Sequence, residues 1–371
     1  MRYILILLLM LFLVGCLTPV EDDITQDDTL ELLWAYPYSM VGWGGRVSPG
    51  VVGDSLVLMT GDEYITCLRA DSGSIKWRYD VPGDFYSFIG SFLFDDQQLY
   101  AWEKNDGYSV YTLDMATGEL NWSIDSCGRS NHHGIGPNYY SPFYKSAFKI
   151  SKSGQVLDTV KSDQTYDSMS YFNGRVYGSI GWSPPNNPNS VGRIICYNEE
   201  TMDSLWTHEE PGGGFDLCYP VFEDGVMYIG TIWGAKNKTL ALNAETGEVI
   251  WDNNNYGAIK MIIVGDVLYR KPGAAVFAMN KTTGEDLWRT NLSNPDERPT
   301  MSYLDGFLYV ENYGTLFILN AETGEIVHKV YGGPDGAGIE QVSTGAGKVF
   351  IQTSRHLYAF NPFNPELKTN E

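Results

Sequence analysis

The sequence predicts an all-β protein, an eight-bladed β-propeller of four-stranded antiparallel blades that is closed by its N-terminal strand. Three observations lead to this fold. One short run of residues recurs eight times along the 371-residue chain, a hairpin signal precedes most copies, and the two ends of the repeated region carry complementary parts of one unit. Repeats of this length made from short strands are typical of radial β architectures.

The recurring run is clearest between Thr239 and Trp251, as TLALNAETGEVIW. Alternating apolar residues such as Leu240 and Leu242 predict a strand with one buried face. Asn-Ala-Glu-Thr-Gly predicts a tight turn with a positive-φ glycine. The second strand ends on a tryptophan, which is large enough to fill the space between neighbouring sheets. The eight turns open 37 to 47 residues apart, at Arg69, Asp114, Ser151, Asn198, Asn243, Asn280, Asn320 and Asn361.

Turn dipeptides upstream of most copies predict the other two strands of each unit. Asn173-Gly174 precedes Tyr177, and Asp224-Gly225 precedes Tyr228. Such dipeptides between strand-like runs are hairpin signals, so two hairpins per unit make a four-stranded blade. The third copy is the weakest, because Asp158 replaces the tryptophan and the hairpin signal is missing.

The tryptophans at the end of the repeat are predicted to be structural residues that pack blade against blade: Trp34, Trp77, Trp122, Trp206, Trp251 and Trp288. The last copy stops at Asn361-Pro362 without such a strand, whereas the run from Leu32 to Tyr36 is a tryptophan strand without a partner. This strand is therefore predicted to complete the eighth blade and leave no open sheet edge. The alternative is an unrelated N-terminal strand.

The ALNAETGEVIW run resembles the tryptophan-docking repeat of the PQQ-like β-propellers, a family that includes quinoprotein alcohol dehydrogenases and the outer-membrane assembly lipoprotein BamB. The resemblance covers nearly all of the chain from Leu32 to Leu367, and the propeller domain is assigned to 32–368. Quinoprotein dehydrogenases of this family usually carry adjacent, disulfide-bonded cysteines and a calcium site. This chain has no adjacent cysteines, so the resemblance implies the scaffold without that site, and we expect no PQQ, other cofactor or metal.

The N-terminus predicts an exported, lipid-anchored protein. Residues 1–15 form a charged start and an apolar run too short to span a bilayer, and Leu13-Val14-Gly15-Cys16 resembles a lipobox. Cys16 would carry the lipid, and residues 16–31 would form an acidic tether. We expect the anchor to lie in the cell envelope, at the periplasmic face of the outer membrane or on the cell surface. The alternative is an ordinary secretory signal with an incidental cysteine.

The composition excludes one class of function. With 25 basic and 46 acidic residues the formal charge is −21, which should repel nucleic acid. The chain contains no Gly-x-Ser-x-Gly, His-Glu-x-x-His or Cys-x-x-Cys motif that would indicate catalysis or a metal. Its four further cysteines, Cys67, Cys127, Cys196 and Cys218, are predicted to be buried or free thiols, with a single disulfide as the alternative.

Two surfaces are candidate binding sites. The first is the mouth of the central channel, where the inner strands begin; its candidate residues are Arg46, His133, Asp167, Asp216, Lys260, Arg298 and Glu340. They either bind a small polar ligand or a partner's loop, or are solvated residues of the mouth. Because His132 and His133 are adjacent on a strand, they should face opposite sides and share no metal. The second surface is a partner site at Trp182 and Trp233, whose alternative is packing against a neighbouring loop.

Together these features favour a monomeric, non-catalytic scaffold that mediates a protein–protein interaction with an envelope partner. The alternative is an enzyme that binds a quinone or a sugar at the channel mouth.

Overall fold

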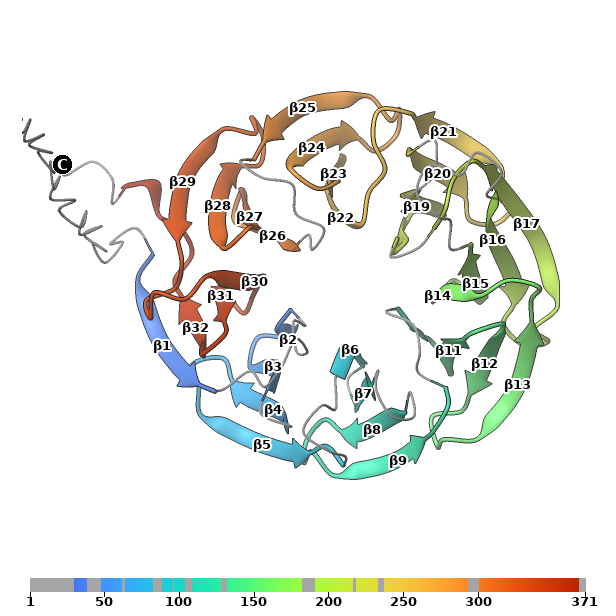
Figure 1. Ribbon diagram of the computed structural model, residues 1–371, viewed down its shortest axis with the longest axis horizontal. Helices are drawn as coiled ribbons and strands as arrows, with labels where there is room; N and C mark the ends of the chain where they lie inside the picture. Colours follow the sequence, from blue (N-terminus) through green and yellow to red (C-terminus); the bar gives the residue numbers. More distant parts are fainter. Residues whose placement is uncertain are drawn as a thin grey trace, which may run out of the picture.

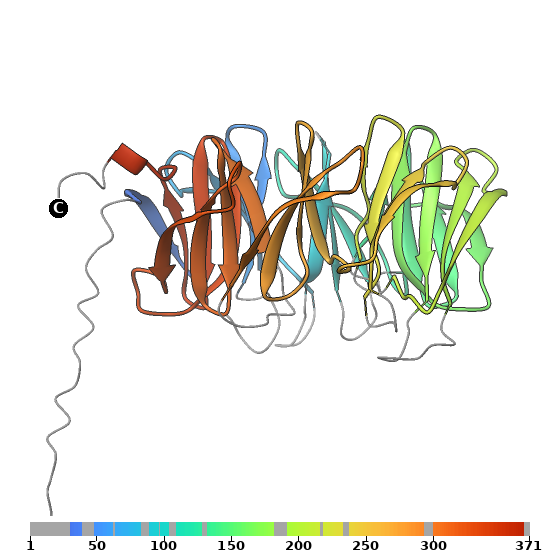
Figure 2. The same cartoon turned by 90° about the horizontal axis from the view of Figure 1, so that it is seen from above.

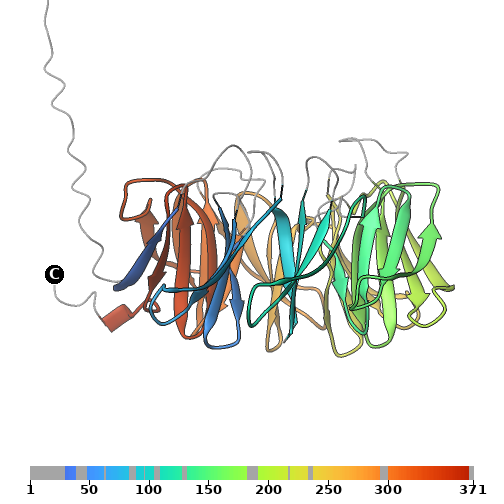
Figure 3. The same cartoon turned by 90° about the horizontal axis from the view of Figure 1, so that it is seen from below.

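The computed structural model describes residues 30–38, 48–61, 64–82, 89–95, 97–103, 109–127, 132–181, 191–215, 218–232, 237–292 and 300–366. Within these ranges, 32 strands form eight four-stranded antiparallel sheets. The sheets are arranged as blades around one axis (Figure 1), and the ring is a flat disc when seen edge-on (Figures 2 and 3). The predicted eight-bladed propeller is confirmed.

Blades 1 to 7 each run from an inner strand to an outer strand in chain order. Blade 1 contains β2 (Gly50–Val52), β3 (Leu56–Gly61), β4 (Tyr64–Arg69) and β5 (Ile75–Asp80). Blade 2 contains β6 (Ile89–Phe94), β7 (Gln98–Glu103), β8 (Val110–Asp114) and β9 (Leu120–Ile124). Blade 3 contains β10 (Gly134–Ile135), β11 (Tyr139–Phe143), β12 (Ser146–Ile150) and β13 (Val156–Lys161). Blade 4 contains β14 (Tyr166–Phe172), β15 (Arg175–Ile180), β16 (Val191–Asn198) and β17 (Ser204–Pro211).

The second half of the ring repeats this order. Blade 5 contains β18 (Val221–Glu223), β19 (Val226–Gly230), β20 (Thr239–Asn243) and β21 (Val249–Asn253). Blade 6 contains β22 (Lys260–Val264), β23 (Val267–Lys271), β24 (Ala275–Asn280) and β25 (Asp286–Asn291). Blade 7 contains β26 (Thr300–Leu304), β27 (Phe307–Asn312), β28 (Thr315–Asn320) and β29 (Ile326–Tyr331). Blade 8 contains β30 (Ile339–Gly345), β31 (Lys348–Thr353), β32 (His356–Phe360) and, as its outer strand, β1 (Leu32–Pro37).

The alternation of strand direction gives the disc two different faces. The tight turns that join the first to the second strand and the third to the fourth strand lie on one face, which we call the turn face. In blade 5 these turns are 224–225 and 244–248. The second and fourth strands end, and the first and third strands begin, on the opposite face, which we call the loop face. Every inner strand therefore begins at the loop face.

The ring is closed as the sequence predicts. β1 pairs with β32 in antiparallel register, with Trp34 opposite Ala359. Just before β1, the backbone of Glu31 accepts a hydrogen bond of 2.9 Å from the Asn361 amide. Leu30 is buried in the core between blades 7 and 8. The two ends of the repeated region thus complete one blade.

Six joints between neighbouring blades share one packing device. The outer-strand indole of one blade covers the turn glycine of the next, and each glycine has a positive φ. A Cβ atom on that glycine would lie 2.5 to 2.7 Å from the indole, so only glycine fits. The pairs are Trp34–Gly73, Trp77–Gly118, Trp122–Gly154, Trp206–Gly247, Trp251–Gly284 and Trp288–Gly324.

Most of these indoles also donate a hydrogen bond to the same place on the next blade. The acceptor is the carbonyl of the residue that follows the turn-opening position, and the N···O distances are 2.9 to 3.1 Å. The donor and acceptor pairs are Trp34–Ala70, Trp77–Met115, Trp122–Lys152, Trp251–Lys281 and Trp288–Ala321. At the joint between blades 4 and 5, the Tyr177 hydroxyl donates to the equivalent carbonyl of Ala244 at 3.0 Å.

The two remaining joints are built differently. Between blades 3 and 4, the tryptophan position holds the exposed Asp158 and the glycine position holds Met202, which is buried and has a φ of 55°. Between blades 7 and 8, His328 takes the tryptophan position and stacks on Phe363 with ring centroids 5.7 Å apart. In both joints the loss of the large residue is matched by a larger side chain on the neighbouring blade.

The four cysteines in the described part are buried free thiols, as predicted. Burial raises the pKa of Cys67 and of Cys196 to about 11, and that of Cys127 to about 12. These three thiols are therefore protonated at neutral pH. Nowhere in the described ranges is there a helix whose length and apolar character would let it cross a membrane.

Candidate functional site

The candidate site lies around the ring axis, where the inner strands begin at the loop face. Lys260 is the first residue of β22. Asp167 and Glu340 each occupy a register shift, between β14 and β15 and between β30 and β31 respectively. Such bulges commonly re-aim a side chain at the start of a strand. These three residues of the predicted channel mouth therefore lie at equivalent places in blades 4, 6 and 8.

The two adjacent histidines face opposite sides, as the sequence predicts. His133 is 1% exposed, its ring lies 3.9 Å from that of Trp102, and its Nδ1 lies 2.7 Å from the Tyr139 hydroxyl. We expected His133 at the channel mouth, but the structure places it in the core between blades 2 and 3. The residue at the axis is His132. Its carbonyl accepts a hydrogen bond of 3.1 Å from the Met169 amide, which ties it to blade 4.

His132, Tyr219 and Lys260 form what we call the axial cluster. The ring of His132 lies 4.9 Å from that of Tyr219, centroid to centroid, with 33° between the planes. Burial, and secondarily the positive charge of Lys260, lowers the pKa of His132 to about 4. The cluster thus joins residues that precede or begin the inner strands of blades 3, 5 and 6.

The charge of Lys260 is not neutralised within the described part of the protein. Burial lowers the pKa of its ammonium group. Among the described residues no carboxylate oxygen lies within ion-pair distance of Lys260, although Lys149, Lys238 and Lys281 each have one. In the described ranges, Lys260 thus differs from Lys149, Lys238 and Lys281 in having no carboxylate partner.

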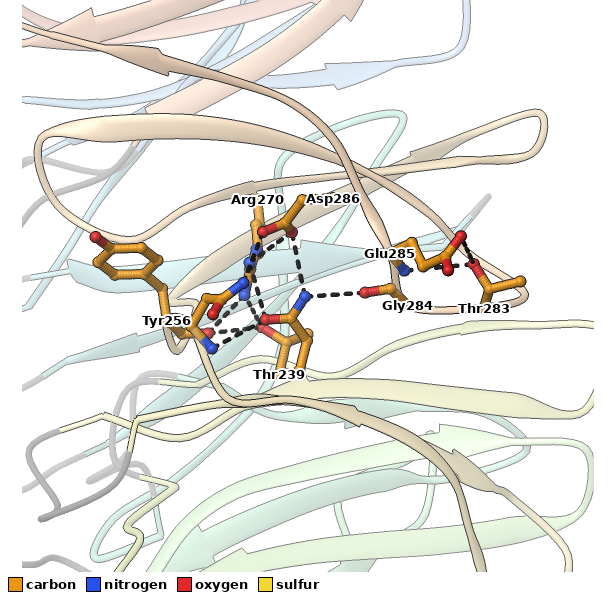
Figure 4. A network of polar contacts seen from close by, with 9 residues as sticks. Thr239, Tyr256, Arg270, Thr283, Gly284, Glu285 and Asp286 are labelled. Carbon is orange, nitrogen blue, oxygen red and sulfur yellow. Dashed lines mark hydrogen bonds and ion pairs between the residues drawn. The ribbon is translucent and has the colours of Figure 1, made fainter.

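A second polar group lies away from the axis, in the joint between blades 5 and 6 (Figure 4). The Arg270 side chain is fully buried; it donates to Thr239 Oγ1 at 2.7 Å, to the Tyr256 carbonyl at 2.5 Å and to Asp286 Oδ1 at 3.0 Å. Asn253 Nδ2 donates to the Gly284 carbonyl at 2.9 Å and to Asp286 Oδ1 at 3.2 Å. Because the charge of Arg270 is already paired, we interpret this network as a clamp between two blades.

Several predicted site residues lie outside the described ranges: Cys16, Arg46, Trp182, Asp216, Trp233 and Arg298. In the described part of the chain, no three His, Cys, Asp or Glu side chains are grouped so that they could hold a metal ion.

The sequence reasoning missed Tyr219, the part played by His132 at the axis, and Arg270. The Arg270 clamp has no counterpart in the repeated run, which carries no signal for it. The sequence predicts that His132 and His133 face opposite sides. It does not predict which of them faces the axis, because β10 has only two residues. Tyr219 could have been found by its place two residues before the inner strand of blade 5.

Comparisons with known proteins agree with this architecture. The solved structure of BamB from Moraxella catarrhalis superposes with a TM-score of 0.68 at 15% identity, covering 90% of this chain and 99% of that one. Sqt1 of Saccharomyces cerevisiae superposes with a TM-score of 0.68 at 12% identity, covering 90% of this chain and 99% of that one. At such low identity these matches show the fold alone.

Two relatives found by sequence are enzymes by name. Tetrathionate hydrolase of Acidithiobacillus ferrooxidans is 23% identical over 365 residues, which is 84% of this chain and 71% of the relative. Quinoprotein ethanol dehydrogenase of Pseudomonas putida is 20% identical over 267 residues, which is 64% of this chain but only 39% of the relative.

A family model described as "Outer membrane protein assembly factor BamB" matches residues 24–139 and 190–359. The unmatched residues between them include most of blade 3 and the first two strands of blade 4. In this region Asp158 occupies the position of the outer-strand tryptophan. The matched residues make up more than half of the chain. The chain therefore belongs to the BamB family of PQQ-like β-propellers.

Proposed function

We propose that this protein is a lipid-anchored, non-catalytic scaffold of the cell envelope that binds a protein partner. The observation that carries the proposal is the family match, which covers six blades and the outer half of blade 4 and carries the description of an outer membrane assembly factor. The Leu13 to Cys16 run adds the anchor, attached either at the periplasmic face of the outer membrane or at the cell surface. The scaffold is monomeric and needs no cofactor.

The partner surface in this proposal is the loop face of blades 4 and 5. Trp182 follows β15 and Trp233 follows β19 in the sequence, so both belong to connections between second and third strands of neighbouring blades. Tryptophans at the centre of an interface frequently supply much of its binding energy. Truncation of both should therefore weaken binding to the partner while the blades remain folded.

Membrane fractionation tests the anchor. We expect Cys16→Ala to block processing and to move the protein out of the membrane fraction. A variant of mature size that still sediments with membranes would refute the anchor.

Crosslinking in intact cells tests the partner surface. The Trp182→Ala, Trp233→Ala double variant should lose the crosslinked envelope protein that the wild type retains. Tyr331→Ala is the matched control, because Tyr331 is 77% exposed and lies on blade 7. Equal crosslinking by all three proteins would place the interface elsewhere.

The alternative is a ligand-binding propeller or an enzyme that uses a quinone or a sugar at the ring axis. The support for this alternative is that two relatives are enzymes by name, a hydrolase and a quinoprotein dehydrogenase. The near-ultraviolet spectrum of protein purified from its native membrane distinguishes the two functions. A bound quinone absorbs there, whereas a scaffold shows only the absorption of its aromatic side chains.

A further inference from the structure

We propose that one sector of the rim of the disc, in blades 6, 7, 8 and 1, binds an anionic lipid surface. The proposal rests on the lipid anchor of the proposed function and deepens it, since it names the surface that an anchored propeller turns toward the membrane.

The first observation is a basic residue at one repeated position of the outer strand. β5, β25 and β29 each have six residues, and the fourth residue is Arg78, Arg289 and Lys329 respectively. All three are exposed. The equivalent residues of the five other outer strands are not basic: Ala35, Ser123, Thr159, Thr207 and Asp252.

The second observation is that an aromatic ring lies beneath each of these cations. The charged group lies 4.5 to 5.5 Å from the centroid of a ring on the third strand of its own blade: Arg78 over Tyr64, Arg289 over Phe277 and Lys329 over Phe317. A long basic side chain in this position packs its stem on the sheet and keeps its charge in the solvent. The three charges are therefore presented at the rim.

The third observation is that these cations lie in consecutive blades on both sides of β1. Blade 8, which β1 completes, stands between blades 7 and 1 in the ring (Figure 1). A fourth exposed cation, Arg355, lies at the loop-face end of β1, where its carbonyl accepts a hydrogen bond of 2.8 Å from the Tyr38 amide. We call Arg78, Arg289, Lys329 and Arg355 the basic rim.

The outer strands of the two halves of the ring differ in charge. Those of blades 6, 7, 8 and 1 contain four Lys or Arg and two Asp or Glu residues. Those of blades 2 to 5 contain one Lys or Arg and four Asp or Glu residues. In the first half, Asp286 is moreover paired with the buried Arg270 at 3.0 Å. The rim that contains β1 is therefore the basic side of an acidic protein.

The position of β1 connects this surface with the membrane. Residues 17–31 separate the predicted lipid on Cys16 from β1, and a segment of this length spans at most about 50 Å. A tether of that reach leaves the orientation of the disc open. The basic rim determines the orientation, because it surrounds the strand at which the tether joins the propeller.

The negative charge of the whole protein does not prevent this contact. The formal charge of −21 is spread over the entire chain, and charges more than about 10 Å from the bilayer are largely screened at 0.1 M salt. Each Lys or Arg close to an anionic membrane raises the affinity about fivefold. The local charge of the rim thus decides which side faces the lipid.

Sedimentation with vesicles tests the basic rim without the lipid anchor. The chain from Leu17 onward keeps every strand of the propeller. We expect it to bind vesicles of equal parts phosphatidylglycerol and phosphatidylcholine at low salt, and not at high salt or when the vesicles are pure phosphatidylcholine. Because this chain carries no lipid, a wrong anchor would leave the result unchanged, and fractionation of Cys16→Ala reports on the anchor separately.

Two double variants with the same net charge locate the surface. Lys329→Gln with Arg355→Gln should lower the affinity for anionic vesicles at least about tenfold, and each single change about fivefold. Lys145→Gln with Lys161→Gln is the matched control, because both lysines are exposed and lie on blade 3. The control should lose less than about twofold, and thermal melting verifies that both double variants are folded.

Three outcomes would overturn the proposal. The first is that the unchanged chain does not bind anionic vesicles, and the second is that the two double variants lose affinity equally. The third is that the rim variant binds vesicles normally but loses a crosslinked envelope protein in cells, which would assign the basic rim to an acidic protein partner.

Discussion

The joint between blades 1 and 2 and the joint between blades 3 and 4 meet the same packing requirement with different residues. In the first, Trp77 covers Gly118 and donates to the Met115 carbonyl at 2.9 Å. In the second there is no tryptophan. Lys149 instead donates through Nζ to the Glu199 carbonyl, which is the acceptor that an indole would use in this turn.

The Lys149 joint also carries a charge pair that the Trp77 joint lacks. Lys149 Nζ lies 3.1 Å from Glu199 Oε1, and the Tyr140 hydroxyl donates to the same oxygen at 2.6 Å. Met202 fills the volume in front of the turn. The comparison shows that a joint requires a side chain that fills the space between the blades and a hydrogen-bond donor for one turn carbonyl. An indole supplies both, and at the joint between blades 3 and 4 two other residues supply them.

The largest effect should come from removing the indole itself. We expect Trp77→Ala to lower the free energy of unfolding by about 3–5 kcal/mol, because the indole is 7% exposed and leaves a cavity. Asp158→Ala, at the equivalent position of blade 3, should change it by less than about 0.5 kcal/mol because Asp158 is exposed. Urea denaturation of the two variants measures the difference. Equal losses would mean that the two joints do not differ as described.

The next effect concerns the cation that replaces the indole. Lys149→Met should cost about 3 kcal/mol, because it leaves the enclosed Glu199 carboxylate without its counter-charge. The control is Lys145→Met, at an exposed position in the turn that precedes β12. Urea denaturation measures both variants. Equal midpoints for Lys149→Met and Lys145→Met would mean that Lys149 does not take the place of an indole in this joint.

The smallest effect isolates the close approach of indole and glycine. Gly118 and Gly225 have almost the same φ, 77° and 78°, but a Cβ would meet Trp77 at 2.6 Å in the first case and nothing within 4 Å in the second. Gly225→Ala should therefore cost about 1–2 kcal/mol for backbone conformation alone. Gly118→Ala should cost about 1–3 kcal/mol more because of overpacking. The melting temperatures of the two variants measure this difference. If Gly118→Ala and Gly225→Ala melt at the same temperature, the indole does not oppose a Cβ at Gly118.

Much of the fold could be predicted because each blade repeats the same local chemistry. The turn of Asn243 shows why: its Oδ1 accepts hydrogen bonds from the amides of Glu245 and Thr246 at 2.8 and 3.0 Å, so four neighbouring residues determine the turn. Lys149 could not be predicted, because it lies on a third strand and replaces a residue that belongs to a fourth strand.

The axial cluster was harder to predict for a different reason. Lys260 could be assigned to the channel because it begins an inner strand. The contact between His132 and Tyr219 joins residues two blades apart, and the local repeat does not determine the distance across the ring. His133 was chosen in place of His132 because a two-residue strand gives no pattern from which to determine which side chain faces inward.

The pairing of β1 with β32 has a consequence for how the chain folds. The first strand of the described chain must remain without its partner until the last strand has been made, because Leu32 pairs with Phe360. Contacts between residues so far apart in sequence form late and slowly, since the whole intervening chain must be brought together first. The seven complete blades can assemble in order of synthesis. The final kinetic step is then the capture of an early strand by a late one, and until that step the unpaired edge of β32 is the part of the molecule most exposed to aggregation.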